Sequence, residues 1–288
     1  MHIPDGFLSP VVSIPALAAA TPVWIYAARK HFGPSAVESL PVMGSVTALA
    51  FVIQTIMIPV PGGTSIHLLG VTLLALRYNP LVAFVCESLV LLMQATFFGA
   101  GGFTVLGVNA LAMGLLGPGA AWLVHRLLGR LSAALQKYGD VLRRGTRGGE
   151  SGRGERSAPL SGGPAGGASA LPPCKAEGPS REVAPAVDTS LNLRRAPLDT
   201  SLNLRRAPLS QKAATFAAAY VAMQVSALSI SLVLGLQHAL SERYFPVPLP
   251  VTLAAMMVPS LVVAGPLEGA YTVLALALLR RSKVHGFS

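Results

Sequence analysis

Charged side chains are scarce in this sequence. Asp, Glu, Lys and Arg make up 12% of its 288 residues, about half the share of a soluble domain, while 52% of the residues are hydrophobic. This composition excludes an ordinary soluble domain and indicates a membrane protein. No basic residue precedes Arg29, so we expect the first apolar segment to be retained rather than removed as a signal peptide.

Sequence signals for several kinds of chemistry are missing too. The two cysteines, Cys86 and Cys174, lie in an apolar run and a polar stretch, so we expect neither a disulfide nor a cysteine-rich zinc site. The chain has no GxxxxGK(S/T) loop for ATP and no HExxH pair of a metalloprotease. We therefore expect no enzyme activity. The basic stretch lacks base-stacking aromatic residues, which argues against a nucleic acid partner.

The chain contains a series of apolar runs. A membrane helix needs about 20 apolar residues. The runs that meet this length span residues 10–28, 40–60, 81–98, 103–128, 213–236 and 251–279. The run 67–78 is too short to cross a bilayer against lipid, so we expect a short helix packed among the others. The sequence therefore predicts an all-α polytopic membrane helical bundle with seven helical segments.

Basic residues are distributed unevenly between the two ends of these segments. Of the 22 Lys and Arg residues, 15 lie between Arg126 and Lys212. If the N-terminus is outside, nearly all the others also lie at inner ends, and Arg243 alone lies outside. The bias predicts a multi-pass protein of the cell membrane with an outer N-terminus and a cytoplasmic C-terminus.

A polar stretch, residues 139–212, interrupts the apolar runs. It is rich in Gly, Arg, Ser and Pro, and DTSLNLRRAPL occurs at 188–198 and again at 199–209. Such a segment buries too little apolar surface to order itself. We predict a disordered cytoplasmic linker between a first membrane part, 1–138, with five helical segments, and a second part, 213–288, with two.

The chain begins MHIPDGFLSP, which places a histidine beside the terminal amine. Methionine before a bulky residue is normally retained, so we expect a free amine at Met1. The amine and the His2 amide nitrogen can close a five-membered chelate ring on a metal ion, and the amide with His2 Nδ1 a six-membered ring. Three nitrogens in one plane favour Ni(II) or Cu(II), with Co(II) a plausible neighbour, over zinc or magnesium.

A fourth nitrogen has a candidate in His67, which follows the glycine turn of PGGTSIHLLG on the same predicted outer side. A histidine at the start of a helix is also commonly a capping or hydrogen-bonding group. Both roles remain open from the spacing alone.

Three motifs resemble the CbiM/NikM family: MHIPDGFLSP, PVPGGTSIHLLG at 59–70 and ESLVLLMQATFFGAGGFTVLGVNALAMGLLGP at 87–118. Members are substrate-binding membrane components of energy-coupling-factor transporters for cobalt and nickel. The resemblance implies that the N-terminus inserts into the bundle from outside. It implies that the Met1 amine, the His2 amide and side chain, and the His67 side chain hold Co(II) or Ni(II) as transported substrate, with no organic cofactor.

The resemblance also implies partners: a membrane coupling subunit, two ATPase subunits that hydrolyse ATP, and in some systems a small auxiliary membrane protein. Polar residues within the predicted spans fit such a picture. Gln94 and Asn109 either support the N-terminal loop or form interhelical hydrogen bonds, and Glu87 and Glu268 favour a structural or coupling role. The residues expected to shape the loop before His67 are Gly62, Gly63, Thr64 and Ser65.

The alternative function is a membrane scaffold or interaction protein without metal transport, with the polar stretch as its interaction arm. That alternative leaves His2 and His67 unexplained. The sequence does not distinguish cobalt from nickel, because the two ions would share all four ligand atoms.

Overall fold

The computed structural model describes residues 1–33, 37–60, 64–147 and 209–281. The chain divides into two units, residues 1–134 with 201–288, and residues 135–200. All the contacts discussed below lie in the first unit. The tandem repeat, apart from its last residue, and most of the predicted linker lie outside the described residues, although helices extend into both ends of that linker.

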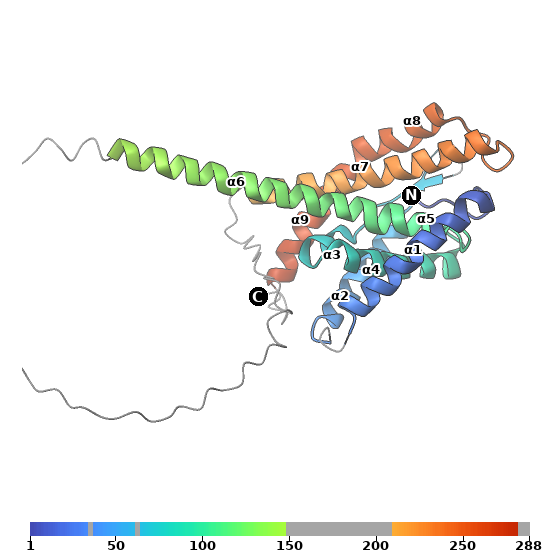
Figure 1. Ribbon diagram of the computed structural model, residues 1–288, viewed down its shortest axis with the longest axis horizontal. Coiled ribbons are helices and arrows are strands. Elements are labelled where there is room, and N and C mark those ends of the chain that lie inside the picture. The colour runs from blue at the N-terminus through green and yellow to red at the C-terminus, as the bar shows by residue number, and fades with distance from the viewer. Residues whose placement is uncertain (34–36, 61–63, 148–208, 282–288) are drawn as a thin grey trace, which may run out of the picture. The chain divides into compact units, whose positions relative to one another are not determined.

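The regular secondary structure of the described residues is helical apart from one short hairpin (Figure 1). Four helices come first: α1 Pro10–His31, α2 Leu40–Gln54, α3 Thr72–Arg77 and α4 Pro80–Phe98. One continuous run follows, made of α5 Leu106–Asn109, the π-helical segment η2 Ala110–Leu116 and α6 Gly117–Arg147. After α7 Leu209–Leu240 the last run contains α8 Leu249–Pro259, the π-helical segment η3 Ser260–Ala264 and α9 Gly265–Arg281. The predicted all-α bundle is confirmed.

Five helical runs among the described residues are long and apolar enough to cross a membrane. They span Pro10–His31, Pro80–Phe98, Leu106–Tyr138, Gln211–Leu240 and Leu249–Leu279. The chain is therefore a multi-pass membrane protein. The outer N-terminus and the cytoplasmic C-terminus remain predictions from the distribution of charge.

The prediction of a helix over 40–60 is wrong for its last residues, 55–60. The helix α2 ends at Gln54, and two strands, β1 Ile58–Val60 and β2 Thr64–Ile66, form an antiparallel hairpin. Pro59 has no N–H for a helical hydrogen bond, and the sequence Pro-Gly-Gly at 61–63 lies between the strands along the chain. His67 follows β2 rather than starting a helix, because α3 begins only at Thr72.

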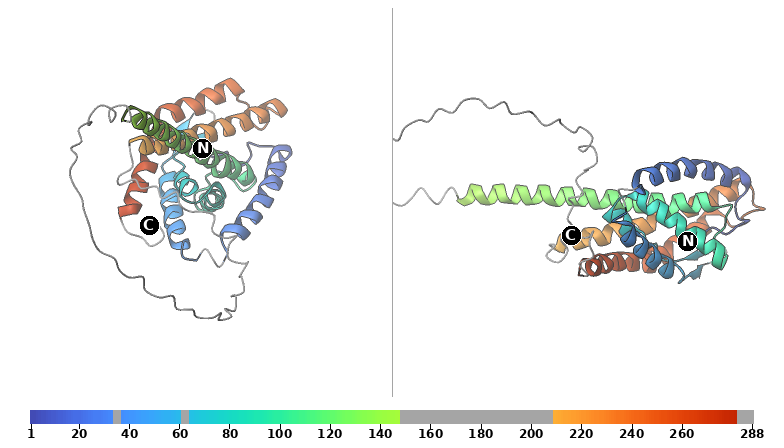
Figure 2. Two further views of the ribbon diagram at one scale, coloured as in Figure 1. Left: turned by 60° about the vertical axis from the view of Figure 1, so that its left-hand side comes forward. Right: turned by 90° about the horizontal axis from the view of Figure 1, so that it is seen from below.

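The helix α7 packs against both interrupted helical runs (Figure 2). Each π-helical segment ends just before a Gly-Pro pair, Gly117-Pro118 or Gly265-Pro266, and a proline without N–H disturbs the regular helical hydrogen bonding there. Side chains of α7 bind carbonyl oxygens of these segments: Ser226 Oγ donates to Ala112 O at 3.2 Å, and Gln224 Nε2 donates to Ser260 O at 3.1 Å.

Candidate metal centre

The first three residues of the chain lie inside the helical bundle. Met1 and Ile3 have 0% of their surface exposed, and His2 has 2%. Figure 1 shows the N-terminus among the helices. The terminal amine and the His2 side chain are thereby removed from solvent, although each is polar. Such burial is costly unless these atoms have partners.

Asn109, at the end of α5, binds the backbone of this N-terminal segment. The Ile3 N–H donates to Asn109 Oδ1 at 3.0 Å, and Asn109 Nδ2 donates to Ile3 O at 3.1 Å. Both polar groups of the Ile3 backbone are thus satisfied without helix or sheet. The structure therefore brings Asn109 to the N-terminal segment, one of the two roles expected for it.

Asp5 fixes the segment at its more exposed end. Its carboxylate accepts from the N–H of Phe103 at 3.1 Å and of Thr104 at 3.0 Å, and from the Thr104 hydroxyl. The neighbouring Gly102 has no room for a side chain, because a Cβ there would lie 2.1 Å from Asp5 Cγ. Sequence reasoning did not single out Asp5, although it is the only acidic residue before Glu38.

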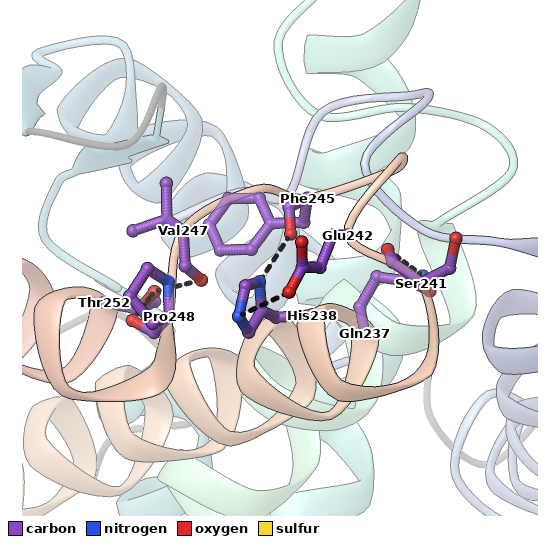
Figure 3. Close-up of polar contacts among 8 residues, drawn as sticks. All are labelled: Gln237, His238, Ser241, Glu242, Phe245, Val247, Pro248 and Thr252. Carbon is purple, nitrogen blue, oxygen red and sulfur yellow. Dashed lines mark hydrogen bonds and ion pairs between the residues drawn. The ribbon is translucent and has the colours of Figure 1, made fainter.

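Gln237, near the end of α7, holds the far end of the segment. Its Oε1 accepts from Ser9 N at 2.8 Å and Ser9 Oγ at 2.9 Å, and its Nε2 donates to Ser241 O at 3.4 Å. Figure 3 shows the loop that follows α7, where His238 Nδ1 lies 3.1 Å from Phe245 O. Gln237 therefore links the N-terminal segment to the loop between α7 and α8, a role that sequence reasoning missed.

His2 and His67 lie against each other. Their rings stack with centroids 4.4 Å apart and planes 27° apart, and His67, like His2, has 2% of its surface exposed. His67 Nδ1 is 2.8 Å from Leu68 O. Because a carbonyl oxygen only accepts, Nδ1 carries the proton and Nε2 has the free lone pair. Within the described residues, His67 Nε2 and both ring nitrogens of His2 have no hydrogen-bond partner.

These nitrogens are disposed to be neutral. Burial lowers the pKa of the Met1 amine well below its usual value, and the attraction of Glu87 for the ammonium form opposes this only in part. Burial likewise lowers the pKa values of His2 and His67, and the positive charge of a protonated Met1 amine lowers both further. Neutral nitrogens keep their lone pairs available for a metal ion.

Gln94, in α4, lies beside His2. Burial dominates the lowering of the His2 pKa, and the polar side chain of Gln94, which favours the protonated ring, acts in the opposite direction. The side chain is fully buried, and its two amide atoms have no hydrogen-bond partner among the described residues. We interpret the contact as a close approach rather than a well-formed bond. Gln94 therefore shares its surroundings with His2.

Glu87 and Gln54 join the helices α4 and α2 beneath the site. Gln54 Nε2 donates to Glu87 Oε2 at 2.8 Å and to Leu69 O at 2.7 Å. Glu268, on α9, accepts from the N–H groups of Leu69 and Gly70. Glu268 thus binds the chain that follows His67 directly, and Glu87 is linked to it through Gln54. Gln54 was not predicted, although it too is a polar residue in an expected span.

The hairpin before His67 is described only in part. Gly62 and Gly63 lie outside the described residues, and Thr64 begins β2 opposite Val60. Ser65 pairs with Pro59, and its Oγ lies 3.7 Å from Met57 Sδ. The loop-shaping role expected of these four residues therefore stays a prediction.

Side chains alone do not make a metal site here. Among the described residues, no group of three or more His, Cys, Asp or Glu side chains is arranged to hold a metal ion. A metal bound beside His2 and His67 therefore needs ligands other than these side chains. The amine of Met1 and the amide of His2 are available at that position. The fold and this centre together define a multi-pass membrane protein with a buried cluster of nitrogen donors.

Comparisons with known proteins identify the family. The model of the CbiM family, described as a cobalt uptake substrate-specific transmembrane region, matches residues 2–145 and 192–285. The chain belongs to this family.

Two relatives and one solved structure illustrate the similarity. The fused nickel transport protein NikMN of Rhodobacter capsulatus is 40% identical over 145 residues, 50% of this chain and 42% of that protein. The cobalt transport protein CbiM of a Roseiflexus species is 37% identical over 128 residues, 44% of this chain and 51% of that protein. A crystal structure of a truncated transition metal transporter aligns with a TM-score of 0.66 and 26% identity, over 98% of this chain and 99% of that one. The chain thus spans about half the length of the curated relatives it matches.

Proposed function

We propose that this chain is the metal-binding, substrate-specific component of a cobalt or nickel uptake system of the energy-coupling-factor type. The Met1 amine, the His2 amide, His2 Nδ1 and His67 Nε2 bind one Co(II) or Ni(II) ion as the transported substrate. The observation that carries the proposal is the stacking of His2 on His67 beside the buried terminus. A membrane scaffold would have no use for these buried, unpartnered nitrogens.

The proposed ligand set accounts for the chemistry of the centre. Amine, amide and imidazole nitrogens of residues 1 and 2 occupy three corners of a square, and His67 Nε2 supplies the fourth. Planar nitrogen ligation suits Ni(II) and Cu(II) better than Zn(II) or Mg(II). The His2 amide must lose its proton to bind. Its single negative charge neutralises only part of the charge of the divalent ion, so the complex keeps a net positive charge. Glu87, whose charge acts on the Met1 amine, is placed to offset it.

The surrounding contacts support capture of an ion in an enclosed site. Asn109, Asp5 and Gln237 hold the N-terminal segment at three successive points. A metal held this way is shielded from water, so loading and release require movement of that segment. We assign ATP hydrolysis to partner ATPases, and coupling to a membrane partner subunit. The chain itself is a transport component rather than an enzyme and needs no organic cofactor.

The metal content of the purified full-length chain tests this function. We expect about one Ni(II) or Co(II) per chain after loading and desalting, and an absorption spectrum of Ni(II) typical of four planar nitrogens. Mg(II) should not bind, because it prefers oxygen ligands. Mass spectrometry of metal and protein gives the stoichiometry. A chain that retains neither Ni(II) nor Co(II) would contradict the proposed function.

The pH dependence of Ni(II) binding should differ between the protein and the free peptide MHIPDG. Protons compete with the metal for nitrogen, so both lose Ni(II) as the pH falls. Burial lowers the pKa values of Met1, His2 and His67 in the protein, so protons compete there only at lower pH. We expect the midpoint of Ni(II) loss to lie at a lower pH for the protein. Absorption titrations measure both midpoints, and an equal or higher midpoint for the protein would refute this expectation.

A further inference from the structure

Glu268 reaches from the last helix to the chain that carries His67. It lies in α9 and is fully buried. Its carboxylate accepts from Leu69 N at 3.0 Å and from Gly70 N at 3.2 Å. These two residues follow His67 after a single intervening residue, Leu68. Glu268 therefore binds the backbone immediately beyond the proposed fourth ligand.

A carboxylate inside a membrane helix is costly and is retained where it has a specific use. Here the partners are two successive backbone N–H groups, which a carboxylate binds more strongly than a neutral acceptor does. Neither N–H belongs to a helix or strand, because β2 ends at Ile66 and α3 begins at Thr72. The two N–H groups of the turn at 69–70 consequently depend on Glu268 for their hydrogen bonds.

The same turn is held from the opposite side by α2. Gln54 Nε2 donates to Leu69 O at 2.7 Å. Gly70 has a φ of +71°, and a Cβ there would lie 3.0 Å from Ala50 Cα. The turn is therefore fixed between two helices that are far apart in sequence, with α9 binding its N–H groups and α2 its carbonyl. A change in the position of α9 relative to α2 must displace the turn.

We propose that Glu268 is a positioning residue for the metal: through the turn at Leu69 and Gly70, α9 sets the position of His67 Nε2 and so the affinity for the ion. The inference rests on the proposed function. It adds that the last membrane helix controls the fourth ligand, while the other three nitrogens are positioned by Asn109 and Asp5. Movement of α9 then weakens one bond to the metal without unfolding the N-terminal segment.

The substitution Glu268→Gln tests this role in the full-length chain. Glutamine keeps the size of the side chain and one oxygen that can accept from both N–H groups, as Oε2 does in Glu268. It loses the negative charge, however, and it places an N–H₂ donor where Oε1 accepts from Gly70 N. We expect Ni(II) affinity to fall about 10-fold, in line with the loss of a hydrogen bond to a charged group. The absorption band of the remaining Ni(II) should shift, because His67 Nε2 leaves its corner of the square.

A control variant and a double variant separate positioning from general stability. Gln224→Leu removes hydrogen bonds between α7 and η3 and should lower thermal stability with the Ni(II) spectrum unchanged. In a His67→Ala background, Glu268→Gln should have no further effect on Ni(II) affinity, since it acts through His67. Equal, additive losses in both backgrounds would overturn the inference.

The outcomes also distinguish this inference from the proposed function. A native chain that binds no Ni(II) or Co(II) overturns both. A native chain that binds the metal, with Glu268→Gln of native affinity and spectrum, overturns the positioning role alone. If Glu268→Gln does not fold, Glu268→Asp replaces it, because aspartate keeps the charge but falls short of the turn by one methylene. The same loss of affinity, abolished in the His67→Ala background, is then expected.

Discussion

A removable extension of several residues before Met1 is expected to abolish Ni(II) and Co(II) binding, and its precise removal to restore it. The extension converts the Met1 amine into an amide and so removes the end of the chelate. The extension also cannot fit, because Met1 is fully buried. The N-terminal segment must therefore give up the hydrogen bonds of Ile3 with Asn109 and of Asp5 with Phe103. Three of the four proposed nitrogens are lost together. Metal per chain before and after cleavage by a protease that leaves no extra residue measures both effects.

The same extension placed after Ser288 is the matched control and should leave metal binding unchanged. The length of the extension matters, because a single added residue would make His2 the third residue, and an amine, two amides and an imidazole can again surround a metal. Mass spectrometry of the native chain should first show an unblocked Met1. Equal metal content of the extended and cleaved proteins would show that the terminal amine takes no part.

Much of the membrane fold follows from the sequence, because lipid imposes length and polarity on each span. Five of the six predicted full-length spans correspond to helices long enough to cross. The run over 40–60 failed because hydropathy does not distinguish an apolar helix from an apolar hairpin. Pro59 and the Pro-Gly-Gly sequence that follows it were the signal against a continuous helix. The length of the apolar run nevertheless favoured the prediction of one membrane-spanning helix.

The centre could be predicted in part for a different reason. The chelating potential of the terminus is local: it depends on residues 1 and 2 alone, and the sequence contains it directly. The stacking of His2 on His67 is not local. The predicted outer side made His67 a candidate, and the family resemblance then paired it with His2. The rule that polar residues in spans face the bundle interior correctly singled out Gln94, Asn109, Glu87 and Glu268, all of which are buried.

Other contacts of the site could not be read from sequence. Asp5 and Gln237 act through partners about 100 and 228 positions away, and no spacing rule relates such pairs. Gln54 was accessible in principle, because it lay inside an expected span, and a polar residue there calls for a buried partner. The sequence indicates which polar residues need partners, and the fold decides which partners they obtain.

His67→Ala is expected to weaken Ni(II) binding strongly. Loss of a residue that only hydrogen-bonds to a metal ligand typically lowers metal affinity by about 10–100-fold, and the loss here should be larger. The substitution removes a donor atom itself, so water or nothing fills the fourth corner of the square. The amine, amide and imidazole of residues 1 and 2 remain. A residual, weaker complex with an altered absorption band should therefore persist. Free imidazole added to the variant should restore part of the affinity by occupying the space left beside His2.

His238→Ala is the matched control, because it removes a histidine that lies outside this centre. His238 binds Phe245 O and lies 3.8 Å from the carboxylate of its neighbour Glu242 (Figure 3). The His238→Ala variant should therefore retain the native metal content and absorption spectrum. Native binding by His67→Ala would assign the stacked ring a packing role and leave the terminus as the whole site. Loss in both variants would instead point to weakened folding, because only one of the two rings lies against His2.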